Sequence, residues 1–188
     1  MKTKKWLLVL TTLSFSVFLN GCKDDSPDPV NEEELITTLR LTFTPTAGSP
    51  VVLQYQDLDG DAGGNPPVLT GDTLNANTAY AVVVEVLNES VDPADNITEE
   101  VEEEGEEHQF FFQFSSALNL SFTYSDLDAG GYPIGLASSA QAGAASMGTL
   151  TVTLRHEPNK HATGVEDGDM TNAGGETDIE VTFDVVIQ

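Results

Sequence analysis

The chain has 188 residues, with 7 lysines and arginines against 31 aspartates and glutamates, and its formal net charge is -24. This charge excludes nucleic acid and anionic lipid surfaces as partners, because the chain has too few cations to displace their counterions. Cations and basic patches on other proteins are the favoured partners. With one cysteine, the chain forms no internal disulfide.

The first 21 residues have the pattern of a signal peptide. Lys2, Lys4 and Lys5 precede an apolar run over residues 6–19, which is shorter than the ~20 residues that a membrane span needs. A small residue stands directly before Cys22. This junction resembles a lipobox, which implies cleavage before Cys22 and acylation of that cysteine. The alternative is an ordinary secretory signal followed by a chance cysteine.

Residues 22–34 are polar and acidic and contain two prolines, and this composition predicts an acylated flexible tether. Lys23, Asp24 and Asp25 directly follow the cysteine. They resemble the lipoprotein export signal of Bacteroidota, which implies a lipid-anchored protein of the outer membrane that is exposed at the cell surface. Residues 35–188 are long enough for a single domain with its own core.

From residue 35 onward, apolar residues alternate with polar ones, which is typical of strands with one buried face. The run 108–114 is apolar on both faces and predicts a central strand. The small residues of 137–148 predict a long turn or a weak edge strand. Clear alternation predicts further strands at 39–44, 51–56, 80–87, 118–124, 149–155 and 179–185.

An acidic segment interrupts this pattern. Residues 95–102 predict a short helix ended by Gly105, with an unstructured acidic loop as the alternative. The glutamates that continue to Glu107 predict a solvated face.

Eight or nine short strands with regular turn signals predict an all-β fold. The expected architecture is an antiparallel β-sandwich of the Ig-like or Greek-key kind, with at most one short helix; a closed barrel is the alternative. Two stretches echo each other, 55–66 and 124–133: each leaves a strand through an aspartate-rich turn with two glycines and ends at a proline. They predict two similar hairpin units, at about 36–90 and 108–157.

The tandem unit, the segment Glu106–Phe112 and the segment Leu154–Lys160 together resemble a group of Flavobacteria-type surface lipoproteins. Members tend to be encoded beside TonB-dependent receptors, and many carry the label "type 1 periplasmic binding fold superfamily protein". The resemblance implies a partnership with a TonB-dependent receptor. The label implies two α/β lobes, whereas the residues show no βαβ pattern.

The aspartate turns are candidate calcium sites. Asp57, Asp59 and Asp61 have the one-three-five spacing of a calcium loop, and the second copy keeps Asp126 and Asp128. The first loop lacks the glycine and the bidentate glutamate of an EF-hand. The alternative is that these aspartates build Asx-turns at hairpin tips.

The histidines are candidates for zinc or copper. His108 begins one predicted strand and His156 ends another, so these residues could meet a carboxylate such as Glu157 or Glu107 if the two strand ends are neighbours. The alternative is that the histidines only form hydrogen bonds. No motif for nucleophilic catalysis is present. The sequence therefore predicts a non-catalytic binding or accessory lipoprotein, with a divalent-metal-binding lipoprotein as the alternative.

Overall fold

The computed structural model describes residues 35–60 and 63–188. The predicted signal peptide, Cys22, the export signal at Lys23–Asp25 and Asp61 lie outside the described residues. The described residues form one compact unit. No helix in the described part of the chain is long and apolar enough to cross a membrane.

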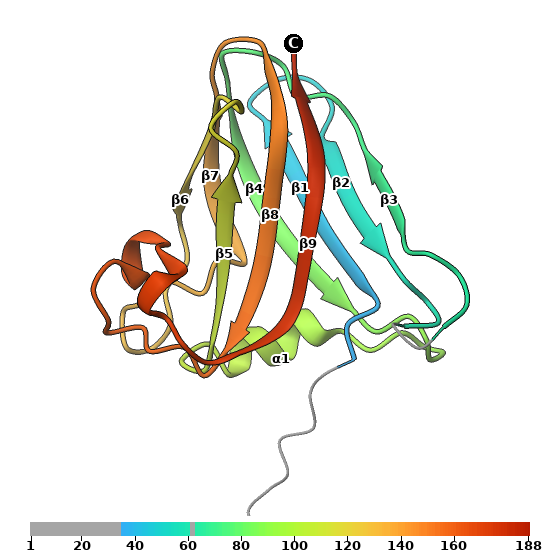
Figure 1. Ribbon diagram of the computed structural model, residues 1–188, viewed down its shortest axis with the longest axis vertical. Helices are drawn as coiled ribbons and strands as arrows, with labels where there is room; N and C mark the ends of the chain where they lie inside the picture. The colour runs from blue at the N-terminus through green and yellow to red at the C-terminus, as the bar shows by residue number, and fades with distance from the viewer. Residues whose placement is uncertain (1–34, 61–62) are drawn as a thin grey trace, which may run out of the picture. The chain divides into compact units, whose positions relative to one another are not determined.

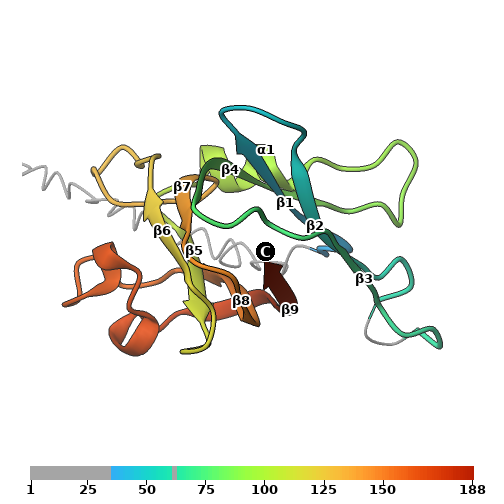
Figure 2. The same cartoon turned by 90° about the horizontal axis from the view of Figure 1, so that it is seen from above.

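The described residues fold into an antiparallel β-sandwich of nine strands, as the alternating pattern predicts. A six-stranded sheet with the order β3-β2-β1-β4-β7-β6 faces a three-stranded sheet with the order β5-β8-β9 (Figure 1). The larger sheet curves, so that its edge strands β6 and β3 approach β5 and β9 (Figure 2). The strands are β1 (Thr38–Pro45), β2 (Val51–Gln56), β3 (Val68–Gly71), β4 (Thr78–Leu87), β5 (His108–Phe114), β6 (Leu120–Tyr124), β7 (Ala137–Ala142), β8 (Ser146–His156) and β9 (Glu176–Ile187).

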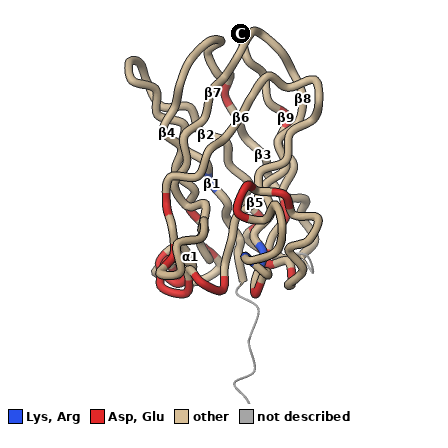
Figure 3. Tube along the Cα trace, turned by 90° about the vertical axis from the view of Figure 1, so that its left-hand side faces the viewer, with Lys and Arg blue, Asp and Glu red and all other residues tan. Residues whose placement is uncertain are grey.

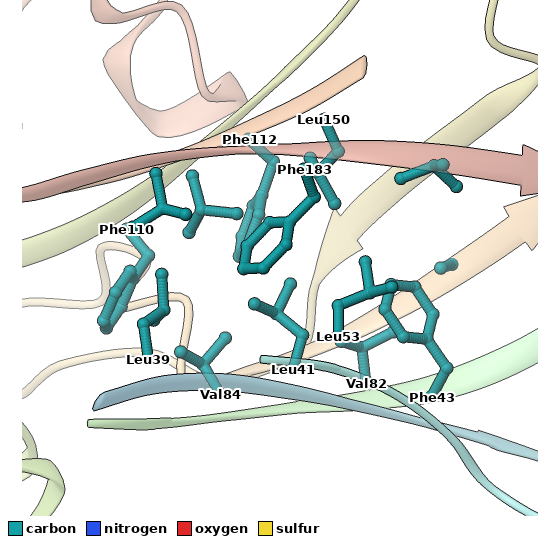
Figure 4. Close-up of a cluster of buried hydrophobic side chains, with 14 of the residues drawn as sticks. Leu39, Leu41, Phe43, Leu53, Val82, Val84, Phe110, Phe112, Leu150 and Phe183 are labelled. Atoms are coloured by element: carbon teal, nitrogen blue, oxygen red, sulfur yellow. The ribbon is translucent and has the colours of Figure 1, made fainter. Parts of the chain in front are cut away.

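The core lies between the two sheets and contains the inward residues of the alternating strands. In the larger sheet Leu41 of β1 pairs with Leu53 of β2 and Val84 of β4, so three aliphatic side chains form one layer. Phe110 and Phe183 face them from the smaller sheet (Figure 4). Because every second residue of these strands is buried, packing of the two inner faces supplies most of the hydrophobic stabilisation.

The central position predicted for the strand at 108–114 is wrong, because β5 is an edge strand of the smaller sheet. Its inner face is buried by the sandwich. The outer face is covered by the segment that carries two short 3-10 helices, η1 (Val165–Asp167) and η2 (Met170–Asn172). Phe111 is fully buried there against Val165 and Ala173. An edge strand with both faces covered has the same apolar pattern as a central one.

The short helix predicted at 95–102 is confirmed as α1 (Ile97–Glu103). It packs by Ile97 and Val101, which are buried, and Thr98 Oγ1 accepts from Val86 N at 2.9 Å at the end of β4. The helix therefore closes one end of the sandwich, and its exposed glutamates lie on the outside.

The two hairpin units predicted at 36–90 and 108–157 share a sequence pattern and differ in strand pairing. All four strands of the first unit belong to the larger sheet, whereas the second unit places β6 and β7 in that sheet and β5 and β8 in the smaller one. The segment 134–136 crosses between the sheets, because Phe110 N donates to Ile134 O and Val84 N donates to Leu136 O. The small side chains of β7 let it pair between β4 and β6. The segment 137–148, for which a long turn or a weak edge strand is predicted, therefore begins with an inner strand.

Candidate functional site

The first aspartate turn is organised by its own carboxylate. Oδ2 of Asp59 accepts from Gly64 N at 3.0 Å, Asn65 N at 3.2 Å and Asn65 Nδ2 at 2.9 Å. The bond from the Asn65 amide has the largest effect on Asp59 and, with the other bonds, lowers the pKa of its carboxyl. Asp57 is buried at the end of β2. These contacts favour the Asx-turn interpretation of the motif over the calcium loop.

In the second aspartate turn, the carboxylates of Asp126 and Asp128 accept hydrogen bonds from the backbone of the same loop. Oδ1 of Asp126 accepts from Gly135 N and Oδ2 accepts from Ala137 N, each at 3.0 Å. Oδ1 of Asp128 accepts from Tyr132 N at 2.9 Å. Both carboxylates thus hold the loop that leads from β6 to β7.

Lys160 ties this loop to the rest of the molecule. Its ammonium group is buried and donates to Asp128 Oδ2 at 2.8 Å, to Pro133 O at 2.9 Å and to Gly105 O. The side chain of Lys160 is 4% exposed and that of Asp128 is 2% exposed. The ion pair therefore fixes three loops at the end of the sandwich that carries α1. Nothing in the sequence marks Lys160, because lysines are rarely buried.

We expect Asp126→Ala to lower the free energy of unfolding by about 2–3 kcal/mol, because two amides lose a charged acceptor. Asp59→Ala is expected to change the melting temperature little, because its loop is exposed to solvent. Thermal unfolding in the presence and absence of millimolar calcium compares the two variants. A calcium-dependent rise in melting temperature that Asp59→Ala removes would favour the calcium loop instead.

The structure brings together the histidines that the sequence singles out. His108 of β5 and His156 of β8 are paired residues of neighbouring strands, and their rings stack with centroids 4.7 Å apart. Asp178 of β9 joins them: its Oδ2 lies 3.9 Å from His108 Nε2. Glu107 and Glu157 form a second group with His156. In each group the nitrogen and oxygen atoms lie within 4.8 Å of one another.

Sequence reasoning missed Asp178, because it directly precedes the strand predicted at 179–185 and nothing local places it beside the histidines. His161, the remaining histidine, is not in the cluster, and its Nδ1 lies 2.7 Å from Tyr132 Oη.

An acidic groove of about 620 Å³ lies beside α1. Its floor contains the buried residues Val84, Ile134 and Leu136. Two apolar side chains, Val83 and Leu127, are 55% and 62% exposed in it. The acidic residues of the wall are Glu102, Glu103, Glu104, Glu106, Glu107, Asp126 and Asp128. Figure 3 shows acidic residues gathered at this end of the sandwich. None of the lining residues in the described part of the chain is basic.

A second groove of about 470 Å³ lies along β5 and β6, where the edges of the two sheets meet. The rings of Phe112 and Phe122 lie 4.6 Å apart and those of Phe114 and Phe122 lie 5.4 Å apart. These aromatic contacts link the edges of the two sheets, so the rings close the side of the core.

Comparison with protein-family models, with curated proteins and with solved structures found no match for this chain. Functional inference therefore rests on the residues and their geometry.

Proposed function

We propose that this protein is a non-catalytic binding protein of the outer-membrane surface, held there by a lipid on Cys22. It serves as an accessory subunit of a TonB-dependent transporter. The acidic groove is the observation that carries the proposal, because it combines a lining of carboxylates with the exposed apolar side chains of Val83 and Leu127. A basic segment of a partner protein that also carries apolar side chains is the complementary ligand.

The electrostatics of the groove support a cationic ligand. The glutamates at positions 102, 103, 104, 106 and 107 are all exposed. Asp126 and Asp128 are instead engaged within the loop that forms the opposite wall. The acidic charge of the whole chain adds a long-range attraction that raises the association rate of a basic partner and weakens with salt.

The walls of the groove are held in place by hydrogen bonds and a buried ion pair. These walls are α1 and the 126–137 loop, and the loop is fixed by Asp126 and by the ion pair between Asp128 and Lys160. Recognition by loops on a rigid sheet is a common arrangement for binding proteins. The sequence supports the anchor and the export signal, Cys22 followed by Lys23, Asp24 and Asp25.

The test reverses the charge of the groove with the triple variant Glu102→Lys, Glu103→Lys and Glu106→Lys. Lysines near the end of α1 also suit its dipole, so the fold should tolerate them. The control variant, Asp92→Lys with Glu176→Lys and Asp184→Lys, makes the same charge change at exposed positions outside the groove. We measure how much of a TonB-dependent receptor from the same outer membrane each variant binds. We expect the groove variant to bind at least ten times less receptor than the control variant does.

Binding of the wild-type protein should also fall when the salt concentration is raised. Equal retention of the receptor by the groove variant and the control would refute the assignment of the groove. Proteinase treatment of intact cells tests the location separately. We expect digestion of the wild-type protein, and its protection would refute exposure at the cell surface.

A further inference from the structure

Three neighbouring strands bring two imidazoles and a carboxylate together at one end of the smaller sheet. His108 is the first residue of β5 and His156 is the last residue of β8, and the two are directly opposed in the ladder. Asp178 lies on β9, next to β8. All three side chains are withdrawn from solvent: those of His108, Asp178 and His156 are 2%, 5% and 10% exposed.

A β-bulge directs Asp178 into this cluster. Arg155 pairs with Thr177 and Leu154 pairs with Ile179, so Asp178 is the extra residue on β9. A bulge of this kind turns a side chain away from the regular alternation of a strand. The backbone around the cluster is also closely packed. Gly175 has φ +71°, and a Cβ atom there would lie 2.2 Å from His156 O.

The hydrogen bond of His108 to Glu104 O defines which of its two nitrogens is available to bind a metal ion. Nδ1 lies 3.2 Å from Glu104 O, and a carbonyl oxygen only accepts, so Nδ1 carries the proton. With the proton on Nδ1, the lone pair of Nε2 is directed toward Asp178 Oδ2, 3.9 Å away. Metal-binding histidines usually have this second hydrogen bond, because it fixes the tautomer and the ring.

We propose that His108, His156 and Asp178 bind a divalent transition cation, with Glu107 as the fourth ligand. Two imidazoles with carboxylates form a donor set that suits zinc, and two carboxylates neutralise its charge. Glu107 Oε2 lies 3.8 Å from His156 Nε2, and its side chain is 59% exposed. Glu107 therefore gives an ion a route from solvent to the buried ligands.

Rotation of one imidazole ring and small shifts of the carboxylates bring these atoms to bonding geometry. Ligand atoms that lie 2.0–2.1 Å from a tetrahedral zinc are about 3.3 Å apart, so the pairs at 3.8 and 3.9 Å must each close by about half an ångström. The two rings are stacked at 14°, and a metal must lie in the plane of each ring that binds it. Binding therefore rotates one ring out of the stack, and His156 at the strand end has the greater freedom.

Zinc titration of the metal-depleted mature protein tests the site, with calcium as the control ion. We expect one zinc per chain and a melting temperature about 5–10 °C higher at a hundredfold excess over Kd. Asp178→Asn and His156→Gln should each weaken zinc binding at least about 10–100-fold, since losing even an outer partner of a ligand costs that much. The matched control is His161→Gln, which removes a histidine outside the cluster and should bind zinc like the wild type.

Imidazole resonances of the wild-type protein give a second readout that needs no variant. Zinc should shift the signals of His108 and His156 at one equivalent and leave those of His161 unchanged. Three results would overturn the proposal: equal zinc affinity in His156→Gln and His161→Gln, a rise in melting temperature with calcium equal to that with zinc, or a shift of the His161 signals alone.

Discussion

Lys160→Met is expected to lower the free energy of unfolding by about 3–5 kcal/mol, because it leaves Asp128 as a buried charge without its partner. The ammonium of Lys160 donates to Asp128, Gly105 and Pro133, so the same change also removes a donor from two carbonyls. Methionine keeps most of the volume of the side chain, so the loss reports the charge and its hydrogen bonds. Urea-induced unfolding followed by circular dichroism measures the effect.

The matched control is Arg40→Met in the pair between Arg40 and Glu85. That pair lies on the larger sheet with its side chains 31% and 41% exposed, so water screens it. Its loss should cost at most about 1 kcal/mol. Equal losses in the two variants would contradict a special role for the buried pair.

The dependence of stability on pH gives a further check on the buried pair. Burial alone would raise the pKa of Asp128, but the hydrogen bonds from Lys160 and Tyr132 outweigh it and lower the pKa below 3.8. A lowered pKa in the folded state means that the stabilisation is complete above the pKa of the unfolded chain. It is lost as the pH falls through the lower folded value. The decrease in stability between pH 5 and pH 2 should therefore be smaller in Asp128→Asn than in the wild type.

Phe111→Ala is expected to lower the free energy of unfolding by about 3–5 kcal/mol, since it empties a fully buried site. Phe111 lies on the outer face of β5 and packs against Val165 and Ala173, away from the main core. The variant should release the segment around η1 and η2 from β5. Amide hydrogen exchange should therefore accelerate over residues 162–173 more than over β8.

Phe114→Ala is the control for Phe111→Ala, because it makes the same change on the same strand. Phe114 is only partly buried, at the rim of the groove between β5 and β6. Its loss should cost roughly half as much. If both variants lost the same stability and showed uniform exchange, the segment with η1 and η2 would not depend on Phe111.

Several features follow from local sequence patterns. Alternation over 39–44 and 179–185 marks residues that line the core, because a strand with one wet face must alternate. The segment around Ile97 and Val101 forms the predicted helix, since its apolar residues are four apart. The predicted histidine site required the ends of two strands to be neighbours, and the pairing of His108 with His156 meets that condition.

Local patterns are sufficient to predict the β class, the buried faces and the candidate histidines, because period-two alternation and residue chemistry are local. Three features required the folded chain: β5 is an edge strand covered by a loop, Lys160 is buried on Asp128, and Asp178 joins the histidines. Each of these depends on which distant segment lies against a residue. A buried face looks the same in the sequence whether a strand or a loop covers it, and a bulge that inserts one residue reverses the side of the sheet toward which a side chain points.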